Sequence, residues 1–237
     1  MGPYRLRRGS DAVWPPKGRA YGGEIETPWL RAKGPLQMAV RLLLPVTLLI
    51  TLLGAAYLYI DDFLALPGAP TFVQNAWLAT SDLVLPMAFY AIHLTNRRYG
   101  AGHAFAPLLA ALAILGLVAL INPADVDNWI NNTPVLTVGS MVAFGAAFLF
   151  ANVIAIIFFD GARGPRRWTA PLAASFAASL SFSVVYYPAA FAGTRNIVWT
   201  DCALVHFCAF IAESVALLLP YYLLRPAMRP LPGMNGY

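Results

Sequence analysis

Four ionisable residues lie inside long apolar stretches of the sequence: Asp82, His93, His206 and Glu213. Carboxyl and imidazole groups exchange protons and hydrogen-bond polar solutes. At the centre of a lipid bilayer, an ionisable group costs at least about 2.5–3.5 kcal/mol on insertion scales. Such residues therefore indicate a function or a deep contact between helices, and Glu213, in the middle of its stretch, indicates it most strongly.

The spacing arranges these residues in two pairs. In a helix, Asp82 and His93 lie about 20° apart around the axis and about 16 Å apart along it. His206 and Glu213, seven residues apart, also share a face. We expect both faces to line a central cavity that contacts a polar substrate or relays protons.

Simpler roles are open for three of the four. Asp82 lies near a helix end, where it could cap the helix or reach the membrane interface. His206 could be a packing histidine. His93 lies at the predicted cytoplasmic end and would be exposed there by default.

Further polar residues lie in two other stretches. Ser175, Ser179 and Ser183 repeat at every fourth position among alanines, and Asn152 lies two-thirds of the way along its stretch. Small-residue stripes let helices approach closely and hydrogen-bond across the contact. The pattern favours helix packing over cavity lining for the serines, and Asn152 suits either.

Metal binding is a specific alternative. Cys202 and His206, with Asp201, have a spacing that could supply ligands from one helix. The sequence carries no HExxH motif, no GxSxG elbow, no Walker loop and no GxGxxG in a βαβ context. It predicts no enzymatic activity and no cofactor.

The amino-acid composition indicates which class of protein these apolar stretches belong to. Of the 237 residues, 59% are hydrophobic and 11% are charged, whereas soluble domains carry about 25% charged residues. A membrane-spanning helix needs about 20 largely apolar residues. Six stretches qualify: 38–60, 76–95, 104–121, 134–159, 170–192 and 202–224. The predicted fold class is all-α, a polytopic membrane protein with six transmembrane helices.

The distribution of charge predicts the orientation. If six stretches alternate across a membrane, all Lys and Arg residues except Arg195 lie on one side. The other side carries Arg195 with Asp61, Asp62, Asp125, Asp127 and Asp201. Basic residues mark the cytoplasmic side, so we expect both termini in the cytoplasm. The compact chain, rich in Arg, Ala and Leu, favours a bacterial inner membrane, and its basic residues are explained without nucleic acid.

The transmembrane domain is predicted over 38–225, with a basic cytoplasmic tail over 1–37 and a short cytoplasmic tail over 226–237. Anionic lipid attracts basic residues near the membrane surface by about 1 kcal/mol each. Trp14, Tyr21 and Trp29 also suit a docking arm for a partner subunit. The expected partners are therefore membrane lipid, a small polar solute, and a second copy or other membrane subunits.

Three segments resemble one known family. Residues 85–100 read LPMAFYAIHLTNRRYG, residues 140–160 begin SMVAF and end FFD, and residues 174–193 run from AS to YPAAFAG. These segments resemble helices of the vitamin-uptake-transporter-like family, the queuosine-precursor transporters. Over roughly 76–225, the resemblance implies a helical transporter whose solute is a deazapurine or vitamin-like precursor.

The chain departs from the family at polar positions. The family's acid before its Asn-Glu-Arg-Tyr-Gly turn is His93 here, and its Glu is Arg97. Its Gln/Asp pair falls near Phe148 and Ala151, and the Asp of its fifth helix falls near Phe182. If the family residues bind a deazapurine, this chain has lost most of them.

The sequence therefore supports three hypotheses of function. The first is a proton-coupled or facilitative transporter of a small polar solute, with Asp82, His93, Asn152, Ser183, His206 and Glu213 as its substrate-binding residues. The second is a non-catalytic accessory subunit of a larger membrane complex, which would use the N-terminal arm and the loop residues Trp77, Trp129 and Trp199. The third is a metal-dependent oxidase subunit.

Overall fold

The fold was analysed in a computed structural model, which describes residues 35–59, 62, 64, 67–74, 76, 78–121, 138–163, 168–193 and 198–230. In these residues the regular elements are helices: α1 (Pro35–Leu58), α2 (Thr71–Gln74), α3 (Thr80–Tyr99), α4 (Ala101–Ile121), α6 (Val138–Gly161), α7 (Thr169–Phe191), α8 (Trp199–Ala216) and α9 (Leu218–Leu224). Most of the N-terminal tail, Trp77, Trp129 and the end of the C-terminal tail lie outside the described residues.

The six stretches predicted to be helical are helices. They correspond to α1, α3, α4, α6, α7, and α8 with α9, and their ends differ from the prediction by a few residues. The last stretch is interrupted at Leu217. Pro220 explains the interruption, because it has no N–H to donate to the carbonyl of Ala216 and its ring crowds that carbonyl.

Helix α3 is the central helix of the bundle. It packs against α1, α4, α6, α7 and α8. Phe89, Ile92, His93 and Asn96 on this helix are completely buried. His93 and Asn96 thus face other helices, and α3 positions Asp82 and His93 of the candidate site.

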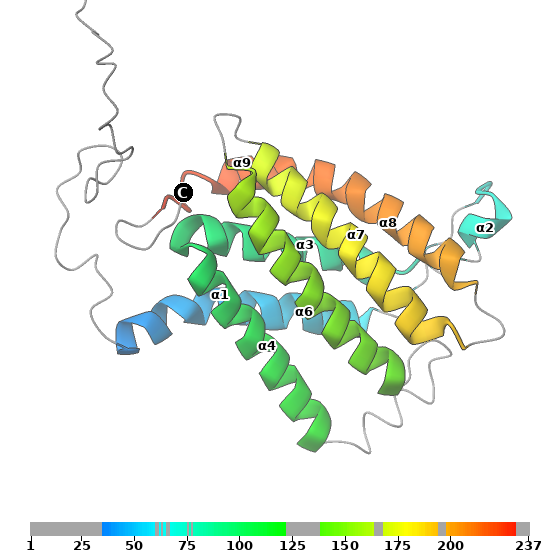
Figure 1. Cartoon of the computed structure of the whole chain (residues 1–237), viewed down its shortest axis with the longest axis horizontal. Coiled ribbons are helices and arrows are strands. Elements are labelled where there is room, and N and C mark those ends of the chain that lie inside the picture. The colour runs from blue at the N-terminus through cyan, green and yellow to red at the C-terminus, as the bar shows by residue number, and fades with distance from the viewer. Residues whose placement is uncertain are drawn as a thin grey trace, which may run out of the picture.

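The helix ends meet in two groups, one at each end of the bundle. The start of α3 lies near the start of α8, because Asp82 contacts His206. At the other end, Arg163 after α6 hydrogen-bonds Asn96 near the end of α3, and Arg98 hydrogen-bonds the carbonyl of Ala227 after α9. Figure 1 shows the α3–α4 turn, the end of α6, the start of α7 and α9 together toward the upper left.

Four helical segments are long and apolar enough to span a membrane: Ala39–Leu58, Val138–Gly161, Thr169–Phe191 and Trp199–Leu224. Helix α4 contributes a shorter apolar segment, Ala101–Leu117. Helix α3 carries Asp82, Arg97 and Arg98. Because α3 packs against five other helices, much of its surface faces protein and need not be apolar. Six spans and the orientation of the termini stay predictions.

The bundle is apolar outside and partly polar inside. Leu36, Leu43 and Leu44 of α1, with Leu219 and Leu223 of α9, are more than 60% exposed. By contrast, the described interior contains histidine, asparagine and serine side chains that are almost fully buried. This distribution is expected where lipid is the solvent around the helices, so the described fold is that of a helical membrane protein.

Candidate functional site

The first polar layer of the site joins the starts of α3 and α8. Nε2 of His206 lies 3.1 Å from Oδ2 of Asp82, and both side chains are mostly buried. The backbone N–H of Ala79 donates to the same carboxylate oxygen at 2.7 Å, which caps the start of α3. The ring of Tyr187 from α7 covers His206, with centroids 4.8 Å apart.

The second ring nitrogen of His206 fixes the protonation of this pair. Nδ1 lies 2.7 Å from the carbonyl oxygen of Cys202, which can only accept a hydrogen bond. Nδ1 therefore carries a proton. The contact between Nε2 and Asp82 then needs a second proton, held either by the imidazolium or by the carboxyl group. In both forms the pair carries one exchangeable proton and no net charge.

An aromatic layer lies beneath this pair. Phe89 of α3 stacks on Phe148 of α6 with centroids 5.7 Å apart, and Phe182 of α7 contacts both Phe89 and Phe210 of α8 edge-on. All four side chains are at most 1% exposed. Phe89 follows Asp82 by two turns, and Phe210 lies between His206 and Glu213. The aromatic layer therefore separates the Asp82–His206 pair from the polar residues further along.

The second polar layer consists of hydrogen bonds from α3 to α8 and to α7. The Tyr90 hydroxyl donates to the carbonyl of Ser214 at 2.6 Å, and Nε2 of His93 lies 3.2 Å from Oγ of Ser175. Because the Ser214 carbonyl only accepts, Tyr90 must donate to it. Nδ1 of His93 is buried and has no partner among the described residues.

Glu213 lies one residue before Ser214 and is the only one of the four predicted ionisable residues without a partner in the described structure. Both of its carboxyl oxygens are buried and accept no hydrogen bond from the described residues. A buried carboxylate without partners is strongly unfavourable. Glu213 is therefore a group that would be stabilised by a proton, water or a polar ligand.

Three other predicted residues lie in the same interior. Asn152 donates from Nδ2 to the carbonyl of Phe148 at 2.8 Å, while its Oδ1 is buried without a partner among the described residues. The hydroxyls of Ser179 and Ser183 on α7 are buried in the same way. Helix packing alone does not satisfy these atoms, so the serine stripe supplies hydrogen-bonding capacity as well as close contact.

The structure corrects one expectation about the histidines. His93 is not exposed at a cytoplasmic end: it is completely buried and stacks on Phe159, with ring centroids 5.6 Å apart. That alternative was wrong because Phe159 of α6 and Ser175 of α7 contact the imidazole ring. The contact of Asp82 is with a histidine of another helix, His206 of α8, which the spacing along a single helix does not predict.

The arrangement does not favour the metal hypothesis. Within the described part of the chain, His, Cys, Asp and Glu side chains form no group of three that could hold an ion. Cys202 contributes its carbonyl oxygen to His206, and not its thiol.

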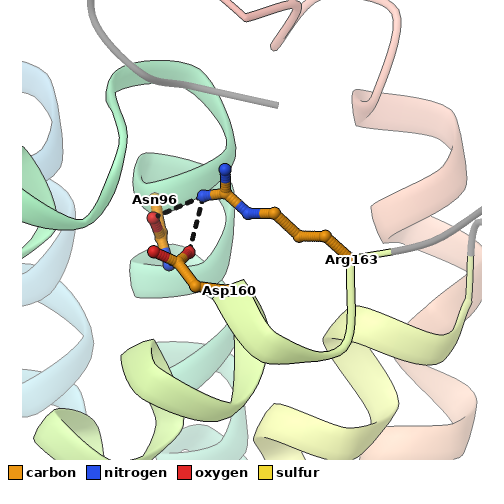
Figure 2. A network of polar contacts seen from close by, with 3 residues as sticks. All are labelled: Asn96, Asp160 and Arg163. Carbon is orange, nitrogen blue, oxygen red and sulfur yellow. Dashed lines mark hydrogen bonds and ion pairs between the residues drawn. The ribbon is translucent and has the colours of Figure 1, made fainter. Parts of the chain in front are cut away.

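A third polar cluster, which the sequence analysis missed, links α3 to the end of α6 (Figure 2). Asn96 donates from Nδ2 to Oδ1 of Asp160 at 3.0 Å. Arg163 donates from Nη2 to the same Asp160 oxygen at 2.6 Å and to Oδ1 of Asn96 at 3.2 Å. One signal was available in the sequence: Asn96 and Asp160 each follow directly after a predicted helix, where polar side chains need partners. Tyr90 was missed as well, although a buried tyrosine hydroxyl regularly has a partner.

Comparisons of the chain with models of protein families, with curated proteins and with solved structures find no match.

Proposed function

We propose that this chain is a multi-pass membrane transporter of a small polar solute, and that Glu213 is its proton-exchanging or solute-binding group. The observation that carries the proposal is the buried carboxyl group of Glu213, which has no hydrogen-bond partner among the described residues. It lies on α8, within a segment long enough to span a membrane. Ionisable groups at such positions mark solute and proton pathways in membrane proteins.

Other buried polar atoms of the bundle support a polar solute. Oxygens of Ser179, Ser183, Ser214 and Asn152, together with Nδ1 of His93, have no partner among the described residues and add hydrogen-bonding capacity to the interior. A solute with several hydrogen-bonding groups would match them. The resemblance to queuosine-precursor transporters makes a deazapurine the first solute to test.

The aromatic layer supports alternating access as the mechanism. Asp82 and His206 lie on one side of the layer, while Glu213 and His93 lie on the other. In the proposed cycle, the closely packed phenylalanines prevent continuous passage, and α8 moves relative to α3 to expose each polar layer in turn.

We also propose that the six long helices all cross a bacterial inner membrane, with both termini in the cytoplasm. The sorting of helix ends supports this topology, because the basic ends of α3, α6 and α9 lie together. Helix α3 would then span the membrane as a buried central helix.

The test is uptake of a labelled deazapurine into cells that express the full chain. We expect Glu213→Gln to abolish uptake while the protein still accumulates in the membrane. Asp62→Asn is the matched control, because Asp62 is exposed and its hydrogen bond from Thr80 can be accepted by an amide oxygen. Uptake by the Glu213→Gln variant at the wild-type rate would contradict the proposal. A stoichiometric complex with other polypeptides, together with no uptake by the wild type, would favour the accessory-subunit hypothesis.

A further inference from the structure

Several buried oxygens without a hydrogen-bond partner in the described structure lie at one level of the bundle, directly past the aromatic layer. They are both carboxyl oxygens of Glu213, Oδ1 of Asn152 and the hydroxyls of Ser179 and Ser214. Asn152, Ser179 and Ser214 are completely buried. Buried polar atoms are normally hydrogen-bonded, so a group of such atoms from three helices calls for an occupant.

Contacts with α3 define the level of Asn152. Phe148 stacks on Phe89 with ring centroids 5.7 Å apart, and Phe159 stacks on His93 with centroids 5.6 Å apart. Asn152 follows Phe148 by four residues and precedes Phe159 by seven, so the three side chains share a face of α6. Asn152 therefore faces α3 between Phe89 and His93, which is one helical turn, about 6 Å.

Ser179 of α7 faces the same turn of α3. Phe182 contacts Phe89 edge-on with centroids 6.4 Å apart, and Oγ of Ser175 lies 3.2 Å from Nε2 of His93. Ser179 lies between Phe182 and Ser175, three residues from one and four from the other, and these spacings keep all three on one face of the helix.

Helix α8 brings its carboxyl group to this level. Phe210 contacts Phe182 edge-on with centroids 6.0 Å apart, and the Ser214 carbonyl accepts the hydrogen bond from Tyr90 at 2.6 Å. Glu213 lies between these two contacts, three residues past Phe210 and one before Ser214. The unpartnered oxygens of α6, α7 and α8 thus meet within about one helical turn.

The charge at this level is one carboxylate among neutral oxygens. Glu213 is the one charged residue in the segments that form the level, which are 89–93, 148–159, 175–182 and 210–214. Oδ1 of Asn152 can only accept, because Nδ2 donates to the Phe148 carbonyl. An ionised Glu213 here needs a positive partner, and one monovalent cation would compensate it.

We infer that Glu213, Asn152, Ser179 and Ser214 bind a sodium ion. Carboxylate, amide and hydroxyl oxygens suit small hard cations. One carboxylate balances a single positive charge, so the site needs no group of three acidic, histidine or cysteine side chains.

The end of α8 supports the same ion. Glu213 and Ser214 lie in the last turn of α8, which ends at Ala216, and Leu217 interrupts the segment before α9. The carbonyl end of a helix carries a partial negative charge. Such ends in interrupted membrane helices coordinate sodium ions. The inference rests on the proposed function for its role in transport, where it names sodium as the ion that Glu213 exchanges.

The test follows the Tm of the purified full-length protein in detergent, in sodium chloride, potassium chloride or choline chloride of equal concentration. We expect a saturable rise in Tm with sodium, a smaller rise with potassium, and none with choline. Equal Tm values in sodium and choline would overturn the inference. A rise with potassium as large as that with sodium would overturn the assignment to sodium.

Substitutions show whether these residues hold the ion. Glu213→Gln should abolish the sodium response, and Ser179→Ala should shift it about tenfold to higher sodium concentration. Asp201→Asn is the matched control, because it removes a carboxylate from the first turn of the same helix, about 18 Å away. An undiminished response in Glu213→Gln would overturn the site. If that variant does not fold, an undiminished response in Ser179→Ala would overturn it equally.

This binding test can fail separately from the proposed function. No sodium response, together with uptake that is lost in Glu213→Gln, would overturn the sodium site and keep the transporter. A sodium response that Glu213→Gln abolishes, together with wild-type uptake by the same variant, would support the sodium site and contradict the proposed function.

Discussion

His206 and Asp82 meet across 124 residues of sequence, with Nε2 of His206 3.1 Å from Oδ2 of Asp82. Because Nδ1 of His206 already donates to the Cys202 carbonyl, one proton lies between the imidazole and the carboxyl group. The contact joins the starts of α3 and α8, and it is the clearest long-range polar link at that end of the bundle.

We expect this link to stabilise the fold as a coupled pair. Asp82→Asn and His206→Gln should each lower the free energy of unfolding, and the double variant should lose less than the sum of the two. Residues in direct contact couple by about 0.5–3 kcal/mol. The measurement is thermal or denaturant unfolding in detergent, arranged as a double-mutant cycle.

Two substitutions of Asp82 distinguish the loss of its charge from the loss of the hydrogen bond that caps α3. Asp82→Asn keeps an oxygen that can accept from the Ala79 N–H, whereas Asp82→Ala removes it. Asp82→Ala should therefore cost about 0.5–2 kcal/mol more than Asp82→Asn. Asp201→Asn, near the start of α8, serves as the control for loss of charge. If the effects of Asp82→Asn and His206→Gln are strictly additive in the double-mutant cycle, His206 and Asp82 only pack together.

The sequence was sufficient to predict the helices but not their neighbours. Each predicted stretch is long and apolar, so its helical state follows from local properties, and α1, α4, α6 and α7 are close to their predicted bounds. Hydrophobic periodicity does not give the order of helices around a bundle. The central place of α3, and with it the complete burial of His93, depends on contacts with five other helices.

In the candidate site, too, the sequence predicts a notable residue but not the contacts between helices. Glu213 stood out in the sequence because a mid-helix carboxyl group is rare in a membrane, and the structure leaves it without a described partner. The contact between His206 and Asp82 was not predictable, because periodicity places residues on a face without saying which helix that face meets. Tyr90, whose hydroxyl reaches the Ser214 carbonyl on α8, was missed for the same reason.

We expect Tyr90→Phe to destabilise the protein. The variant removes the hydroxyl that donates to the buried Ser214 carbonyl at 2.6 Å. The expected cost is about 1–3 kcal/mol, measured as a lower Tm. Tyr222→Phe is the matched control, because Tyr222 is exposed on α9. Equal effects of the two substitutions would show that the hydrogen bond from Tyr90 to Ser214 contributes little.

The number of spans can be tested at one glycine. In a six-span topology the turn between α3 and α4 lies on the cytoplasmic side. If only the four segments with sufficient length and apolarity crossed the membrane, this turn would lie outside. Gly102 is exposed in the first turn of α4, directly after the connection from α3, and a Cβ atom added there meets nothing within 4 Å. A cysteine at this position should fold without strain.

We expect Gly102→Cys to resist a membrane-impermeant maleimide in intact cells and to react after the cells are opened. Gly193→Cys, after α7, is the external control, and Gly161→Cys, at the end of α6, is the internal control; both positions have the same open space. Cys202 and Cys208 are first replaced by alanine. Labelling of Gly102→Cys in intact cells, together with Gly193→Cys, would rule out six spans.

The Asn96–Asp160 contact can be tested by exchanging the two side chains. Asn96→Asp alone replaces the amide donor by a second carboxylate next to Asp160, where the donor–acceptor distance is 3.0 Å. Repulsion and the lost hydrogen bond should cost about 1–3 kcal/mol, seen as a lower Tm. Adding Asp160→Asn restores one amide and one carboxylate with their roles reversed, and Arg163 can donate to either oxygen. The double variant should therefore recover most of the stability that Asn96→Asp loses. If it is instead less stable than Asn96→Asp, the orientation of the amide is essential, and the contact between α3 and α6 depends on Asp160 as the acceptor.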